Sequence, residues 1–299
     1  MTTAPEPLFG RVVTAMVTPF DADERLDLDA AQQLARHLAD HGSDGLCVAG
    51  TTGEAPVLTD PERLDLIKAV AEAVTIPVLA GTTTNDTEHS VGLTRQAAGL
   101  GAAGILAVTP YYNRPSQAGL SGHFAAVAEA TDLPVVLYDI PVRTGRKIST
   151  ETIVALYDAH ANIIGVKDAA GDPYATAELL AIASDLLVMS GDDGLTLPLL
   201  AVGAAGVISV ASHWVGETFG AMIEAFLASD LTRAKELNAS MIPSFRYESS
   251  DRWPNPLPTK AILRSMSLPV GQCRLPMGPA DAELDRRASE LAASLGLLG

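Results

Sequence analysis

One lysine stands at the end of a short apolar run, where its amine could form a covalent bond with a carbonyl compound. Lys167 follows the stretch from Ile163 to Val166, which is typical of a strand buried on both faces. Such interiors rarely hold an ammonium group, because removing it from water is costly unless it is paired or neutral. Lys167 is therefore either a strand-end lysine that reaches solvent or a partly buried amine that can form a Schiff base.

Tyrosine, threonine and arginine side chains follow other apolar runs in the same way. Thr51-Thr52 closes one run, Tyr138 ends another, and Arg143 comes five residues after Tyr138. Tyr111 and Tyr112 follow a third run, and because adjacent residues on an extended segment face opposite ways, at most one of them points towards the others. These side chains gather around Lys167 only if one fold brings the ends of the runs to the same place.

A single fold would bring these residues together. Short apolar runs alternate with stretches that have apolar residues at i, i+3 and i+4, which predicts strand–helix units. Eight such units favour an α/β fold of the (β/α)₈ TIM-barrel type, in which the C-terminal ends of the strands meet at one mouth. The predicted strands are Val12–Phe20, Gly45–Gly53, Pro77–Thr82, Gly104–Pro110, Pro134–Pro141, Ile163–Ala169, Leu186–Asp193 and Gly206–Val210. The predicted helices between them are Leu28–His41, Asp60–Val74, Thr87–Leu100, Ala118–Thr131, Ser149–His160, Tyr174–Ser184 and His213–Ala228.

The alternation stops after Ala228. Residues 230–247 and 280–296 are predicted to be helices with no strand between them, and prolines interrupt the segment that joins them. We therefore predict a catalytic barrel over residues 1–229 and a C-terminal α-helical extension over residues 230–299. Lys167 is the only lysine at any of the predicted strand ends, which favours a functional role for it.

Composition excludes several classes of protein. The formal charge of −16 argues against a nucleic-acid partner, which needs a basic face. Cys47 and Cys273 do not make a disulfide framework and are expected to be reduced. Met1–Leu8 lacks the pattern of a secretion signal, and no apolar run is long enough for a membrane span. A cytoplasmic protein is expected.

Alternative motifs have the wrong context. Gly99-x-Gly101-x-x-Gly104 matches a dinucleotide fingerprint in letters, but it precedes a predicted strand instead of following one. His37 and His41 are four residues apart on a helix without the companion glutamate of a zinc site, so a surface pair is expected. Asp192-Asp193 fits a loop at the barrel mouth as well as a cation site. No cofactor and no metal are expected.

Four segments resemble the signatures of the dihydrodipicolinate synthases, within the pyruvate-dependent class I aldolase or N-acetylneuraminate lyase family. The segments are Gly50-Thr51-Thr52-Gly53-Glu54, Pro110-Tyr111-Tyr112-Asn113-Arg114-Pro115, Tyr138-Asp139-Ile140-Pro141-x-Arg143-Thr144-Gly145 and Gly165-Val166-Lys167-Asp168. Asn255-Pro256-x-Pro258-x-Lys260 extends the resemblance into the C-terminal segment, so it covers nearly the whole chain.

The resemblance implies that Lys167 forms a Schiff base with pyruvate and that the resulting enamine attacks L-aspartate 4-semialdehyde, in the diaminopimelate route to lysine. It assigns proton transfer to Tyr138, which Thr51 would link to Tyr112 of a neighbouring subunit. It also assigns substrate binding to four residues. Thr52 would hold the pyruvate carboxylate, Arg143 would hold the carboxylate of the second substrate, and the backbone carbonyls of Gly191 and Ile208 would border the site.

The resemblance also suggests a homotetramer, built as a dimer of dimers, and it leaves two alternatives open. One is a sibling lyase acting on N-acetylneuraminate or a 2-keto-3-deoxy sugar acid, although such relatives lack the arginine at position 143. The other is an inactive barrel that serves as a binding subunit. Relatives inhibited by lysine carry other residues at the positions of Ala55, Arg63 and His89, so we expect feedback inhibition by lysine to be weak or absent.

Overall fold

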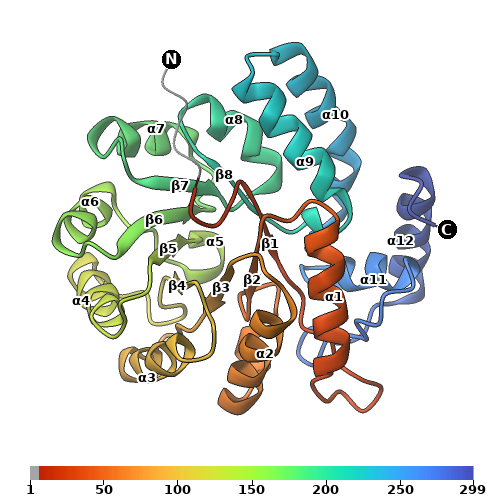
Figure 1. Ribbon diagram of the computed structural model, residues 1–299, viewed down its shortest axis with the longest axis horizontal. Coiled ribbons are helices and arrows are strands. Elements are labelled where there is room, and N and C mark those ends of the chain that lie inside the picture. The colour runs from red at the N-terminus through yellow and green to blue at the C-terminus, as the bar shows by residue number, and fades with distance from the viewer. Residues whose placement is uncertain (1–6, 299) are drawn as a thin grey trace.

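Eight parallel strands close into a barrel in the order of the chain, with β1 pairing to β8 (Figure 1). The computed structural model describes residues 7–298, and it confirms the predicted (β/α)₈ class. The strands are β1 (Val12–Ala15), β2 (Gly45–Val48), β3 (Val78–Gly81), β4 (Gly104–Val108), β5 (Val135–Asp139), β6 (Ile163–Asp168), β7 (Leu187–Ser190) and β8 (Gly206–Ser209). Each lies inside a predicted run, and the residues that the runs added at their C-terminal ends form the loops of the mouth.

Helices surround the strands, and the seven predicted between strands or after β8 are all present. The helices of this part are α1 (Leu28–Asp40), α2 (Asp60–Ala73), α3 (Thr87–Ala98), α4 (Gln117–Ala128), α5 (Pro141–Thr144), α6 (Thr150–Ala159), α7 (Pro173–Ile182), α8 (Thr196–Ala201) and α9 (Ser212–Leu227). The sequence did not predict α5 and α8. Both are too short to show a helical period, and each begins within a few residues of a strand end.

Side chains that cap the first turn explain where several helices begin. Thr59 and Glu62 form a reciprocal capping box at the start of α2, and Pro61 occupies its first turn. The Ser149 hydroxyl accepts a hydrogen bond from the backbone N–H of Thr152 at the start of α6. Both caps satisfy N–H groups that the helix itself leaves unpaired.

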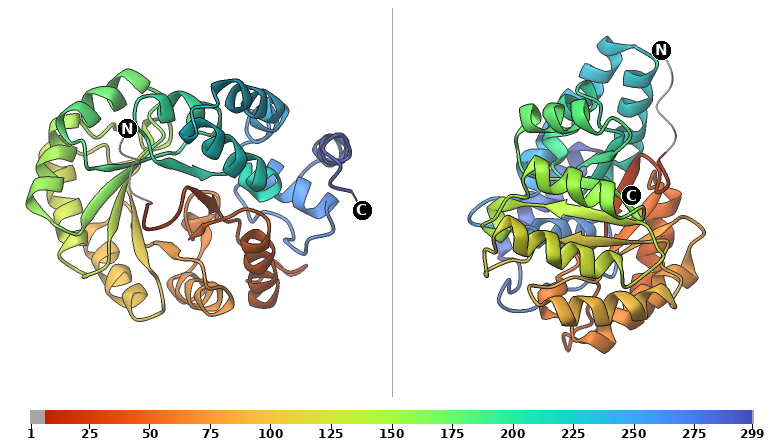
Figure 2. Two further views of the ribbon diagram at one scale, coloured as in Figure 1. Left: turned by 45° about the horizontal axis from the view of Figure 1, so that its top comes forward. Right: turned by 90° about the vertical axis from the view of Figure 1, so that its left-hand side faces the viewer.

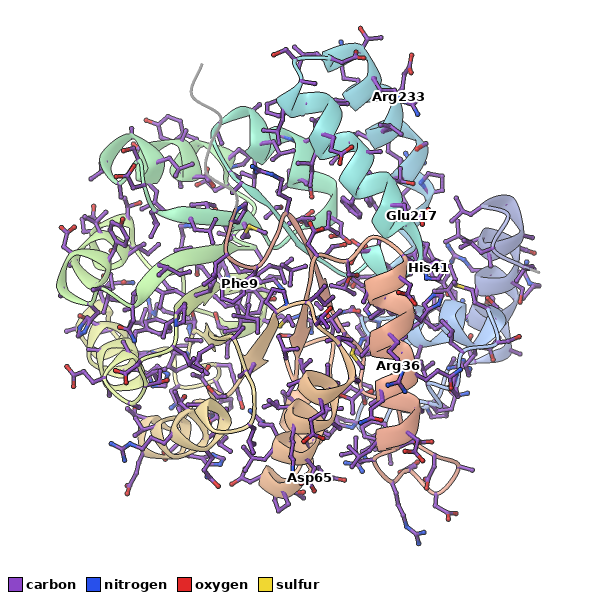
Figure 3. The ribbon with its side chains drawn as sticks, viewed as in Figure 1. Phe9, Arg36, His41, Asp65, Glu217 and Arg233 are labelled. Atoms are coloured by element: carbon purple, nitrogen blue, oxygen red, sulfur yellow. The ribbon has the colours of Figure 1, made fainter. Side chains whose placement is uncertain are left out.

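An apolar cluster fills the inside of the barrel. Phe9 lies at the N-terminal end of this cluster, and Figure 3 shows it within the ring of strands. A Cβ atom at Gly104 would overlap the ring of Phe9, so only glycine leaves room for that ring. Tyr138 and Ile140 belong to the same cluster at the opposite end. The N-terminal end of the barrel is therefore filled, and the C-terminal end is the one that bears polar groups.

Three helices follow the barrel: α10 (Leu231–Tyr247), α11 (Leu257–Ser265) and α12 (Ala282–Ser294). The prediction missed α11, because its prolines were read as interruptions, whereas Pro258 lies in the first turn, where proline is tolerated. Figure 2 shows these helices on the side of the barrel next to α1 and α9. They share an apolar core with α9 that includes Phe219, Tyr247 and Ile262. The division at residue 230 stays a prediction.

Among the described residues, no helix combines the length and the apolar character that crossing a bilayer requires. Residues 1–6 of the segment in which no secretion signal was predicted lie outside the described residues. The cytoplasmic location also stays a prediction.

Candidate active site

Lys167 and Tyr138 lie side by side at the C-terminal ends of two neighbouring strands. They are register partners between β5 and β6, and Nζ of Lys167 lies 4.3 Å from the centroid of the Tyr138 ring. Their exposed fractions are only 5% and 4%. Side chains alternate along a strand, so both point into the barrel, while their neighbours Asp139 and Asp168 point outwards.

The outward carboxylates have partners of their own. Asp139 accepts a hydrogen bond from the backbone N–H of Ile148 at 3.1 Å and pairs with Lys147 at 3.3 Å. Burial raises the pKa of Asp139 to about 6, against the opposing effects of these two partners. Asp168 accepts hydrogen bonds from the Thr176 hydroxyl and from the backbone N–H of Ala170. Neither carboxylate therefore serves as the partner of Lys167.

A glycine makes room for the Lys167 side chain. A Cβ atom at Gly191 would lie 3.0 Å from Cγ of Lys167 and 2.9 Å from Cβ of Ala169. The backbone N–H of Gly191 also donates to the Asp168 carbonyl at 2.7 Å, which fixes the loop after β7 against β6. Ile208 of β8 is buried in the same apolar cluster as Tyr138. Any side chain at position 191 would therefore displace the lysine.

The thiol near this lysine is not a competing nucleophile. Cys47 points into the barrel, and burial raises the pKa of its thiol to about 11, although the Lys167 charge opposes that shift. A thiol of that pKa is almost entirely protonated at neutral pH, and the thiolate is the reactive form. Of these two inward-pointing groups, the amine is the candidate nucleophile.

The loop after β2 holds the two adjacent threonines. Its backbone is constrained, because Ala49 and Glu54 both adopt positive φ angles, of 55° and 56°. Such angles are unfavourable for residues other than glycine and are found where the surroundings fix the backbone, often at functional sites. Thr51 lines a cavity, whereas Thr52 is buried behind it, and the Thr52 hydroxyl accepts a hydrogen bond from Nδ2 of Asn255 at 2.9 Å.

A buried ion pair connects the end of this loop to the C-terminal extension. Nζ of Lys260 lies 2.7 Å from Oε1 of Glu54, and both side chains are almost fully buried. Lys260 also donates to the Gln272 carbonyl at 2.9 Å and lies over the ring of Phe20. The second oxygen of Glu54 accepts from the backbone N–H of Arg274. The extension therefore fixes the threonine loop from behind.

A cavity of about 220 Å³ opens at the mouth of the barrel. Among the predicted site residues, Thr51, Tyr138 and Arg143 line it directly. Lys167 does not line it but contacts Tyr138, which does. The lining has two arginines and no carboxylate: Ala49, Gly50, Thr51, Ala55, Pro56, Arg63, Gly81, Thr83, Leu106, Val108, Tyr111, Tyr138, Ile140, Arg143 and Thr144. Such a lining suits anionic ligands.

The two adjacent tyrosines point in different directions. Tyr111 lines the cavity, whereas Tyr112 is 89% exposed and has a φ angle of 69°. The structure therefore does not bring Tyr112 into the site of its own chain. Among the described residues, no hydrogen bond joins the hydroxyls of Thr51 and Tyr138.

The residues expected to weaken lysine binding have local partners. Arg63 is buried, and it donates to the carbonyls of Gly81 at 3.3 Å and Ala55 at 2.8 Å. His89 lies at the start of α3, and its Nε2 is 2.9 Å from a carboxylate oxygen of Asp60. Arg63 therefore places a cationic group at the cavity wall. His89 places an imidazole, which is cationic when protonated, beside the start of α2.

The histidine pair on α1 lies away from the site. His37 and His41 stack with ring centroids 4.1 Å apart. Figure 3 shows His41 at the end of α1 beside α9, outside the ring of strands. In residues 7–298, no group of three or more His, Cys, Asp or Glu side chains is arranged to hold a metal ion.

Two contributions from the extension were missed by the analysis of the sequence. Asn255 and Lys260 were noted as part of a motif, but their contacts with Thr52 and Glu54 were not predicted. A buried lysine needs a partner of opposite charge, so the apolar run Ala261-Ile262-Leu263 that follows Lys260 could have suggested one. The sequence does not say which glutamate supplies it.

The comparisons with known proteins agree with one another. A sequence model described as the dihydrodipicolinate synthetase family matches residues 8–294. A 4-hydroxy-tetrahydrodipicolinate synthase from Moorella thermoacetica is 49% identical over 97% of this chain and 99% of that protein. One from Acidothermus cellulolyticus is 50% identical over 99% and 96%. A crystal structure of the enzyme from Cyanidioschyzon merolae with lysine bound has a TM-score of 0.94 at 41% identity, covering 98% of this chain and all of that one.

Proposed function

Because this chain belongs to the dihydrodipicolinate synthetase family, we propose how its own residues carry out the family's reaction. The enzyme condenses pyruvate with L-aspartate 4-semialdehyde to 4-hydroxy-tetrahydrodipicolinate, in the diaminopimelate route to lysine. The observation that supports Lys167 as the nucleophile is its buried amine in contact with the Tyr138 ring, beside a cavity without carboxylates.

Lys167 starts the reaction by attacking the ketone carbon of pyruvate. Loss of water from the adduct gives a Schiff base, whose positive nitrogen makes the pyruvate methyl group acidic. Removal of a methyl proton gives the enamine, and its nucleophilic carbon attacks the aldehyde of the second substrate. The amino group of that substrate then attacks the former ketone carbon, which closes the ring and releases Lys167.

Tyr138 carries the protons in these steps. Its ring lies against Lys167 and lines the cavity, so a substrate bonded to Lys167 would lie within reach of its hydroxyl. A phenol has an ordinary pKa of about 10, so a relay is needed to move protons at neutral pH. Thr51 and the Tyr112 of another subunit supply this relay in our proposal.

Two groups hold the substrate carboxylates. Thr52 binds the carboxylate of pyruvate, and the Arg143 guanidinium at the cavity wall binds that of the aldehyde substrate. A planar guanidinium can donate two parallel hydrogen bonds to a carboxylate. The backbone carbonyls of Gly191 and Ile208 border the reacting carbons.

A panel of aldehydes tests the acceptor. With pyruvate present, L-aspartate 4-semialdehyde is expected to be consumed, while N-acetylmannosamine and glyceraldehyde are not. Arg143→Ala should raise the KM for the semialdehyde by about tenfold or more, because a hydrogen-bonded charge is lost. Preference for a sugar aldehyde would instead identify a sibling lyase.

Replacement of Tyr138 by phenylalanine should slow turnover by roughly 10²- to 10⁴-fold, the usual contribution of positioned proton transfer. The ring that contacts Lys167 is retained, so we expect the protein to fold normally. Steady-state kinetics with both substrates measures the loss. A Tyr138→Phe enzyme with wild-type kcat would contradict the role of the hydroxyl.

We propose that the working form is a homotetramer, in which Tyr112 completes the site of a neighbouring subunit. Its 89% exposure and positive φ angle support this, because a tyrosine held out from its own chain gains contacts only in an assembly. Sedimentation velocity is expected to give the mass of four chains.

Mixing two inactive variants tests whether sites are shared. Tyr112→Phe lacks the donated hydroxyl and Lys167→Ala lacks the nucleophile, so each alone should be nearly inactive. After the two are dissociated and reassembled together, some sites combine Lys167 of one chain with Tyr112 of another, and activity should return. If activity stays at the level of the separate variants, Tyr112 does not act across an interface.

Lysine should inhibit this enzyme weakly or not at all. The buried guanidinium of Arg63 forms no ion pair within residues 7–298 and donates to two backbone carbonyls, and its charge opposes the binding of a cationic amino acid nearby. A lysine titration of the initial rate measures the effect. One relative has been crystallised with lysine bound. Strong inhibition of this enzyme at sub-millimolar lysine would refute the prediction.

A further inference from the structure

One residue of the C-terminal extension contacts both groups that hold substrate carboxylates in the proposed function. The Asn255 side chain donates from Nδ2 to the Thr52 hydroxyl at 2.9 Å. Its backbone carbonyl accepts a hydrogen bond from Nη2 of Arg143 at 3.4 Å. Asn255 is buried and its contact with Thr52 lies in the interior, whereas its contact with Arg143 is only partly buried.

The direction of the hydrogen bond to Thr52 has a chemical consequence. A hydroxyl group has one proton to donate, and its oxygen can accept. Because the Thr52 oxygen already accepts from the Asn255 amide, the hydroxyl proton remains available for an anion. The amide itself is oriented by Thr259, whose hydroxyl donates to Oδ1 of Asn255 at 3.1 Å. This chain of contacts makes Thr52 a donor.

The backbone on both sides of the contact is held in place. Glu54, two residues after Thr52, pairs with Lys260, five residues after Asn255. The backbone N–H of Arg274 fixes the other oxygen of Glu54 at 2.9 Å. The threonine loop and the segment around Asn255 therefore keep one relative position, in which the amide reaches the hydroxyl.

We propose that Asn255 is a positioning residue for pyruvate, which orients the Thr52 hydroxyl as a hydrogen-bond donor to the substrate carboxylate. This inference rests on the proposed function, in which Thr52 holds that carboxylate. Asn255 acts on pyruvate through Thr52. Its side chain has no role in binding the aldehyde substrate, because Asn255 contacts Arg143 only through its backbone carbonyl.

Trapping with borohydride measures pyruvate binding apart from turnover. Asn255→Ala should raise the pyruvate concentration needed for half-maximal trapping by about tenfold, the worth of a hydrogen bond to a charged group. The KM for the aldehyde should stay within about threefold, because the backbone contact to Arg143 remains. If the wild type is not trapped at all, the proposed function fails; if the wild type is trapped and Asn255→Ala needs no more pyruvate, only the positioning role fails.

Asn255→Asp tests the direction of the hydrogen bond with nearly the same shape. An aspartate would accept the Thr52 proton and add a negative charge near the substrate carboxylate, so its effect should exceed that of alanine. Half-maximal trapping at the wild-type pyruvate concentration would overturn the proposal.

A double-mutant cycle distinguishes action through Thr52 from general damage. Thr52→Val alone should raise the half-saturating pyruvate concentration, and adding Asn255→Ala should raise it little further, because residues that act as a unit are non-additive. A double variant in which the two fold-changes multiply would overturn the proposal.

Asn162→Ala is a matched control. The Asn162 side chain also donates from Nδ2, to the carbonyls of Ala128, Thr131 and Leu133, at the opposite end of the barrel. Its loss should lower the melting temperature without changing the pyruvate dependence of trapping. If Asn162→Ala shifts that dependence as much as Asn255→Ala, the effect is structural and the positioning role is refuted.

Discussion

Replacement of Lys167 by alanine is expected to abolish both turnover and the covalent trapping of pyruvate. A Schiff base requires a primary amine, and among the inward-pointing groups at this mouth Lys167 provides it. We expect kcat to fall by at least about three orders of magnitude, as when a covalent nucleophile is removed. Mass spectrometry after borohydride treatment should show one reduced pyruvate adduct per wild-type chain and none on Lys167→Ala.

A surface lysine provides the control for this experiment. Lys68 lies on α2 with its side chain 55% exposed, and Lys68→Ala should keep the adduct and the activity. Peptide mapping should place the wild-type adduct on the peptide that contains Lys167. An adduct that persists on Lys167→Ala, or its absence from the wild type, would refute Schiff-base chemistry at this residue.

Removal of Lys260 should lower the free energy of unfolding by about 3–5 kcal/mol, the cost of leaving a buried charge unpaired. Its side chain is fully buried, and its ammonium lies 2.7 Å from the Glu54 carboxylate. Lys260→Ala would leave the buried Glu54 carboxylate without a cation, with the backbone N–H of Arg274 and the thiol of Cys273 beside it. Urea denaturation followed by circular dichroism measures the change.

Two comparisons separate the buried charge from other causes. The double variant Glu54→Gln with Lys260→Met removes both charges and should be more stable than Lys260→Ala alone. Arg286 and Glu290 form an exposed pair on α12, and Arg286→Ala should cost only about 0.5 kcal/mol or less. If Lys260→Ala and Arg286→Ala lower the free energy of unfolding equally, burial of the Lys260–Glu54 pair does not raise the cost of losing one partner.

The sequence predicts the barrel well because the barrel is built from local signals. Each strand is a short apolar run, and helices such as α2 and α6 begin at capping residues that are visible in the letters, Thr59 and Ser149. The misses have local causes too. α8 has only six residues, which is too short for a helical period, and the prolines of α11 were taken for a break.

The site was predictable where it depends on strand order and not where it depends on distant contacts. Lys167 and Tyr138 end consecutive strands, so parallel pairing brings them together. Thr52 and Asn255 are 203 positions apart, and no periodicity relates a loop of the barrel to a segment of the extension. The orientations of Tyr111 and Tyr112 also depend on a local φ angle that residue types alone do not determine.

The ring of Phe9 gives the barrel a closed floor. With that end filled, both substrates enter and the product leaves at the C-terminal ends of the strands, where the cavity lies. Lys167 lies beside Tyr138, which lines that cavity, and the enamine has to form on Lys167 before it can attack the aldehyde, so pyruvate has to react first. The two substrates therefore pass through the same cavity in the order in which they react: pyruvate first, and the aldehyde second.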